Sequence, residues 1–135
     1  MTANKKESLR WLSQAEKDLQ SAKNSLKAND YEWACFQSQQ SAEKALKSIL
    51  YARGLRKILT HSVFELIRVV GEFAPQLKNL KKEAKTLDSV YIASRYPNGI
   101  AGELAPFEYF EEEDARECIR CAGLILEEAK KLMPK

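Results

Sequence analysis

The sequence lacks any apolar run near the ~20 residues that a helix needs to span a membrane, and no apolar export signal follows Met1. It has only three cysteines, an odd number that argues against a disulfide framework and favours the reducing cytoplasm. Histidine occurs once, at His61. A glycine-rich phosphate loop, a Ser-His-Asp order, paired catalytic carboxylates and the Gly-Ser motif of nucleotidyltransferases are also missing. We therefore expect a cytoplasmic protein without a membrane span or a cofactor.

Helix-breaking residues and strand patterns are scarce as well. The five glycines and four prolines fall almost entirely at the ends of predicted helices, and no segment alternates between apolar and polar residues. With 135 residues, 44% apolar and 30% charged, the chain suits a single globular domain over residues 1–135. The net charge of +3 is too small to imply a nucleic-acid partner unless the charge is locally concentrated.

Helical periodicity is clear in the first half of the chain. A first helix is predicted at Lys5–Ala28, with an apolar seam made of Leu12, Ala15, Leu19, Ala22 and Leu26. A second helix is predicted at Tyr31–Ala52, with Asn29 or Asp30 as its N-cap and Gly54 as its C′ residue. Because the connection is so short, the two helices are expected to form an antiparallel hairpin.

Three further helices are predicted in the second half of the chain. They cover His61–Phe73, with Thr60 as N-cap, then Leu77–Ser94, and finally Glu112–Leu132. Between the last two, the stretch YPNGIAGELAP contains too many prolines and glycines to be helical. The sequence therefore predicts an all-α, up-and-down bundle of about five helices.

The predicted second helix has two different faces. One is an apolar seam formed by Cys35, Ala42, Leu46 and Ile49. The other is expected to be a polar ridge without apolar neighbours, formed by Gln37, Gln40, Lys44 and Lys47. Glu43 lies four residues before Lys47, which predicts a helical ion pair worth at most about 0.5 kcal/mol.

This helix also carries a family resemblance. The run QSAEKALKSIL at Gln40–Leu50 resembles the second helix of HEPN domains, small helical nucleotide-binding domains that typically read Q-A-A-E-K-A-L-K-A-L-L there. Ala15–Lys23 resembles their first helix, and Tyr91–Asn98 resembles their S/A-R-Y-P-D segment, with Asn98 where the family usually has Asp. The resemblance implies a helical bundle that forms a homodimer and has a cleft facing a nucleotide.

One candidate ligand site lies at the end of the predicted fourth helix. Asp88, Tyr91 and Arg95 share one helix face, and Tyr96 adds a second ring. An aromatic ring next to a guanidinium suits base stacking and phosphate binding, and Lys44 would approach if the second and fourth helices pack together. The alternative is structural: Arg95 caps the last carbonyls of its own helix and pairs with Asp88 or with the acidic run after Phe110.

A second candidate site is catalytic. Many HEPN proteins are metal-independent ribonucleases in which four to six residues separate an Arg from a following His, and Arg56 and His61, with four residues between them, fit that spacing. In that mechanism the imidazole moves the 2′-hydroxyl proton while the guanidinium stabilises the phosphate. The pair precedes the third helix, earlier than in the family, and the usual tyrosine two residues after the histidine is absent. The alternative is that His61 is a capping or surface residue.

Cysteine and charge patterns complete the candidates. Cys118 and Cys121, with Cys35 and His61, would make a Cys₃His set, but the pair lies within a helix, so we expect buried thiols and no metal. The basic run at Arg53, Arg56 and Lys57 is a candidate binding surface for a phosphate backbone, and the alternative is a solvated helix end. Together with an acidic run at 111–114 it forms two poles. Such poles suit self-association about a two-fold axis, which large aromatic residues at Trp11, Trp33 and Tyr109 would also favour.

Three functions remain open from the sequence. The first is a dimeric module that binds a nucleotide or RNA and acts with a separately encoded minimal nucleotidyltransferase, because the chain lacks that enzyme's own motif. The second is a ribonuclease of a toxin–antitoxin pair that uses Arg56 and His61. The third is a dimerisation scaffold without a ligand.

Overall fold

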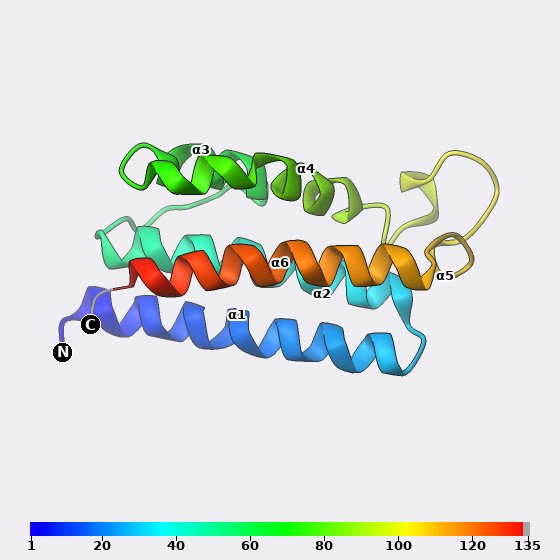
Figure 1. Ribbon diagram of the computed structural model, residues 1–135, viewed down its shortest axis with the longest axis horizontal. Coiled ribbons are helices and arrows are strands. Elements are labelled where there is room, and N and C mark those ends of the chain that lie inside the picture. The colour runs from blue at the N-terminus through cyan, green and yellow to red at the C-terminus, as the bar shows by residue number, and fades with distance from the viewer. Residues whose placement is uncertain (134–135) are drawn as a thin grey trace.

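The computed structural model describes residues 1–133, and every regular element within that range is helical (Figure 1). The α-helices are α1 (Ala3–Lys27), α2 (Tyr31–Ala52), α3 (Val63–Gly71), α4 (Lys81–Val90), α5 (Pro106–Tyr109) and α6 (Glu112–Leu132). Two 3₁₀ helices, η1 (Pro75–Leu80) and η2 (Pro97–Gly99), lie on either side of α4. The predicted all-α bundle is confirmed.

Helix α2 lies at the centre of the molecule and packs against α1, α3, α4 and α6. In Figure 1, α1, α2 and α6 run side by side along the long axis, while α3 and α4 form a shorter layer over them. The segment from η2 to α5 projects at the end of the bundle where α2 begins. None of the helices within residues 1–133 is long and apolar enough to cross a membrane.

The α1–α2 hairpin forms as predicted, and of the two residues considered as N-cap of α2 the structure places Asp30 there and gives Asn29 another role. Asn29 has a left-handed φ of 64° and follows the end of α1, where the Asp30 amide donates to the Ser25 carbonyl at 2.9 Å. Asn29 is therefore the C′ residue of α1 rather than an N-cap, and Asp30 occupies the N-cap position of α2 without a capping side-chain bond. Gly54, with φ of 93°, is the C′ residue of α2, as predicted.

The start of α3 differs from the prediction. The helix begins at Val63 rather than His61, and its N-cap is Ser62, whose hydroxyl accepts from the Glu65 amide at 3.1 Å. Thr60 is not the cap; its hydroxyl accepts from the Ser62 amide and donates to the Glu65 carboxylate. Thr60, His61 and Ser62 are consecutive polar residues that could each cap the helix. The N-cap is Ser62, which also bonds to Asp88 of α4.

The predicted helix at Leu77–Ser94 was too long at both ends. Its first part belongs to η1, which Pro75 begins, and α4 ends at Val90. Irregular turns then lead to Tyr96, whose backbone is extended (φ −126°, ψ 130°) because the following Pro97 disfavours a helical conformation there. After these turns, Tyr91 and Arg95 both lie close to Phe36 of α2.

The prediction of an exposed polar ridge on α2 is wrong for Lys47. Lys47 is buried, and so are its neighbours Gln39, Glu43 and Ser48. Packing on several sides of α2 leaves little of its surface in water, so its polar side chains must find partners inside the protein. The Glu43–Lys47 pair is therefore a buried ion pair, with both side chains only 5% exposed, and not an ordinary pair on a helix surface.

Candidate functional site

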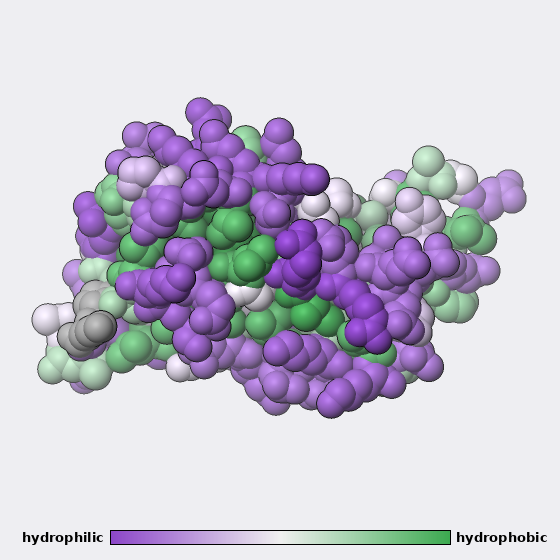
Figure 2. Space-filling view, viewed as in Figure 1, coloured by the Kyte–Doolittle hydropathy of each residue, from purple (hydrophilic) through white to green (hydrophobic). Residues whose placement is uncertain are grey.

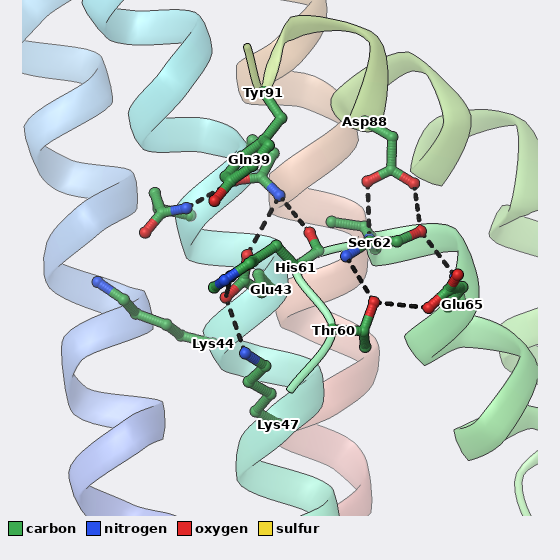
Figure 3. A network of polar contacts seen from close by, with 12 residues as sticks. Gln39, Glu43, Lys44, Lys47, Thr60, His61, Ser62, Glu65, Asp88 and Tyr91 are labelled. Carbon is green, nitrogen blue, oxygen red and sulfur yellow. Dashed lines mark hydrogen bonds and ion pairs between the residues drawn. The ribbon is translucent and has the colours of Figure 1, made fainter. Parts of the chain in front are cut away.

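The buried carboxylate of Glu43 is the centre of a polar network (Figure 3). One of its oxygens lies 3.0 Å from the Lys47 ammonium and 3.3 Å from Nδ1 of His61. The other accepts a bond of 3.4 Å from the Gln39 amide. Three partners thus share one buried charge, which is the arrangement that makes a buried carboxylate tolerable.

The same network holds the backbone that carries His61. The Gln39 side chain also donates to the His61 carbonyl at 2.9 Å, and Ser62 is held by the carboxylate of Asp88 at 2.8 Å. The His61 side chain is nevertheless 58% exposed. Because Nδ1 faces Glu43, the imidazole presents its other nitrogen, Nε2, as the atom available to a ligand.

Tyr91 covers one face of this imidazole. The two rings stack with centroids 5.5 Å apart and planes 16° apart. The Tyr91 ring also lies 6.2 Å from the ring of Phe36, whose centre is 6.2 Å from that of Trp33. A row of aromatic rings therefore runs from the start of α2 to the loop before α3, and it joins residues far apart in the sequence.

Arg95 supplies the positive charge beside these rings. The centre of its guanidinium lies 4.3 Å from the Phe36 ring, 4.7 Å from Tyr91 and 5.1 Å from Tyr96. Its Nε and one terminal nitrogen donate to the Tyr91 carbonyl at 3.0 and 2.8 Å. The capping bonds considered from the sequence are thus present, and the guanidinium, with five N–H groups, retains further donors.

Asp88 and Lys44 take supporting positions around these residues. Both oxygens of Asp88 accept from the start of α3, including the amides of Val63 at 2.7 Å and Phe64 at 3.0 Å. This carboxylate therefore caps α3, where the helix dipole favours a negative charge. Lys44 forms an ion pair of 2.7 Å with Asp18, which joins α1 to α2.

The structure rearranges the two candidate sites of the sequence. His61 lies beside Tyr91 and thereby joins the Tyr91–Arg95 group, although the sequence placed it in a separate site. Arg56, its expected partner, instead donates to the side chain of Asn4 and to the Leu55 carbonyl.

Sequence reasoning missed Phe36 and the contact between Glu43 and His61. The four-residue spacing of Glu43 and Lys47 was visible, but nothing in the sequence showed that this pair is buried beneath the only histidine.

The cysteines lie apart from this group. Cys35, Cys118 and Cys121 are buried free thiols. Burial raises the pKa of Cys121 to about 12, and a hydrogen bond with Cys35, together with burial, raises the pKa of Cys118. Within the part of the chain that the structure describes, His, Cys, Asp and Glu side chains form no group of three or more that could hold a metal ion.

Comparison with known proteins gives consistent results. The model of the HEPN domain matches residues 8–132. A protein of Methanocaldococcus jannaschii named "Putative toxin MJ1304" is 34% identical over 127 residues, covering 89% of this chain and 84% of that protein.

Two crystal structures are also similar. TT1696 from Thermus thermophilus has a TM-score of 0.87 and 34% identity over 93% of this chain and 98% of that one. ST0689, an archaeal HEPN homologue, has a TM-score of 0.78 and 39% identity over 95% of this chain and 98% of that one. The chain belongs to the HEPN domain family.

Proposed function

We propose that this HEPN domain binds a nucleotide or a short stretch of RNA on the surface formed by His61, Tyr91, Arg95 and Tyr96, called here the His61–Arg95 surface. The observation that carries the proposal is the position of the Arg95 guanidinium within 5.1 Å of three aromatic ring centres. A base can stack on an exposed ring, which is worth about 1–3 kcal/mol, while a guanidinium binds phosphate oxygens through paired hydrogen bonds.

Rigidity supports this assignment. The Arg95 side chain is anchored by two bonds to the Tyr91 carbonyl, and the Tyr91 ring packs near both His61 and Phe36. Little side-chain entropy is then lost when a ligand binds. In this proposal Lys44 and Asp88 contribute by fixing the helices around the surface.

We further propose that the domain works as a homodimer with a separately encoded minimal nucleotidyltransferase. The chain has no motif for nucleotidyl transfer, so a partner would perform the chemistry. Exposed aromatic side chains favour association: Trp33 is 48% and Tyr109 49% exposed. Trp11, the third aromatic residue considered, packs against Tyr51 with ring centres 5.0 Å apart.

The binding proposal is tested with Arg95→Ala in titrations with a nucleoside triphosphate and a fluorescent RNA oligomer. Loss of a charge-assisted hydrogen bond predicts weaker binding by about 1.5–3 kcal/mol. The matched control is Arg68→Ala, which removes an exposed arginine of α3 that forms no side-chain hydrogen bond or ion pair within residues 1–133. Equal affinities for Arg95→Ala and the native domain would overturn the proposal, provided that circular dichroism shows both to be folded.

A ribonuclease is the second candidate, because Glu43 orients His61 as a carboxylate orients a catalytic histidine. Nε2 of His61 would take the 2′-hydroxyl proton as that oxygen attacks the adjacent phosphorus and the bond to the 5′ oxygen breaks. The leaving 5′ oxygen would take a proton from water, and the imidazolium of His61 would return its proton to water, so the products would be a 2′,3′-cyclic phosphate and a 5′-hydroxyl. Arg56 or Arg95 would stabilise the phosphate. Cleavage in the presence of a chelator that disappears in His61→Ala would support this activity, and comparing Arg56→Ala with Arg95→Ala would identify the cation.

A further inference from the structure

We propose that two segments at opposite ends of the bundle form a reciprocal interface with a second copy of the chain. The acidic arm (residues 103–114) of one copy would contact the basic loop (residues 53–59) of the other, and the reverse contact would form at the other end. This inference rests on the proposed homodimer and defines its interface.

The two segments carry opposite charges that are largely unpaired. Every charged side chain in the acidic arm is Asp or Glu, and every one in the basic loop is Lys or Arg. Among the ion pairs within residues 1–133, only one involves either segment, and it joins Glu112 to Arg116 on the same helix. Opposite charge on two surfaces favours and orients their association.

Each segment also exposes a large apolar side chain. Leu59 in the basic loop is 84% exposed, and Phe107 in the acidic arm is 69% exposed. Apart from Met1 at the chain terminus, these are the two most exposed large hydrophobic residues in the described chain. Figure 2 shows hydrophobic atoms among hydrophilic ones on the projection that carries the arm. Such residues, surrounded by polar groups, are typical anchors of a protein interface.

One chain cannot bring these segments together by itself. The acidic arm lies at the end of the bundle where α2 begins, and the basic loop follows the other end of α2 (Figure 1). The 22 residues of α2 separate them by about 33 Å, at 1.5 Å per residue.

A second copy can satisfy both segments at once. If two bundles lie antiparallel about a two-fold axis, the acidic arm of each copy faces the basic loop of the other. Both copies then contribute the same surface to the interface. The partner's arm would then lie next to Leu59, two residues before His61, and border the His61–Arg95 surface.

Charge exchange tests the interface. The loop variant (Arg56→Glu with Lys57→Glu) and the arm variant (Glu103→Lys with Glu113→Lys) each place like charges opposite one another. We expect each variant alone to raise the dimer dissociation constant by about tenfold or more in sedimentation equilibrium, a change of 1.4 kcal/mol. A mixture of the two variants should regain native affinity, because each acidic segment again meets a basic one.

Matched controls keep the result specific. Reversing Glu16 and Lys23, two exposed charges on α1, should leave dimerisation unchanged. Leu59→Ser and Phe107→Ser should each weaken the dimer and leave the melting temperature unchanged at a concentration too low for dimerisation. Leu124→Ser, which changes an exposed leucine of α6, should leave the dimer unchanged.

The outcomes separate this inference from the proposed function. A native chain that stays monomeric at tens of micromolar overturns both the homodimer and the interface. A native dimer that neither variant weakens, or whose weakened variants are not restored by mixing, overturns the interface alone. Ligand titrations with Arg95→Ala test the binding proposal independently, because Arg95 belongs neither to the acidic arm nor to the basic loop.

Discussion

Replacing Glu43 by Gln should strongly destabilise the domain, although the change removes one charge and almost no volume. In the native protein the Lys47 ammonium lies 3.0 Å from Glu43, and its side chain is 5% exposed. The replacement removes the carboxylate charge beside the Lys47 ammonium, which otherwise lies 5.8 Å from the centre of the Trp11 ring. Removing one partner of a buried ion pair costs about 3–5 kcal/mol, because the other charge stays buried without compensation.

A double variant separates this charge effect from other consequences. Lys47→Met in the Glu43→Gln background removes the uncompensated ammonium and keeps an apolar stem of similar length. We expect it to recover most of the lost stability, because replacing both members of a buried pair is often nearly neutral. The surface pair of Arg116 and Glu112, with side chains 63% and 53% exposed, is the control, and Glu112→Gln should cost less than about 1 kcal/mol.

The measurement is urea denaturation followed by circular dichroism, with the free energy of unfolding extrapolated to water. A loss of 3–5 kcal/mol would be a large part of the roughly 5–15 kcal/mol that stabilises a typical domain. The reasoning is wrong if Glu43→Gln costs no more than Glu112→Gln, or if the double variant is as unstable as the single one. An altered m-value would instead show a change in the unfolding transition itself.

Two further predictions concern other buried groups. Asp88→Ala should lower the free energy of unfolding by at least about 2 kcal/mol, because three hydrogen bonds to its carboxylate, from Ser62, Val63 and Phe64, are lost together. Asp18→Ala, which removes the partner of Lys44, is the comparison. A similar loss in both variants would contradict the capping role of Asp88. The free thiols should react with a disulfide reagent only on unfolding, since burial raises the pKa of Cys121 to about 12 and keeps it protonated at neutral pH. Rapid labelling of the folded domain would refute that prediction.

The long helices were predictable because their signals are local. Helix α6 was expected at Glu112–Leu132 and has those bounds, and α1 and α2 differ from their predicted ends by at most two residues. Their apolar periodicity extends over many turns, which outweighs uncertainty at single positions. The shorter α3 and α4 were less accurate because their ends depend on competing caps and on Pro97, and on Asp88, which reaches α3 from another helix.

The four-residue spacing of Tyr91 and Arg95 was enough to group them correctly as neighbours, although both follow the end of α4. Packing between segments far apart in the chain places His61 on Tyr91 and buries Glu43 beneath the imidazole, and no local pattern showed either contact. The physical reason is that helical spacing depends on the local backbone, whereas burial depends on what packs against each face. A polar residue looks the same in the sequence whether its face meets water or another part of the chain, so its partners become known only when the whole bundle is assembled.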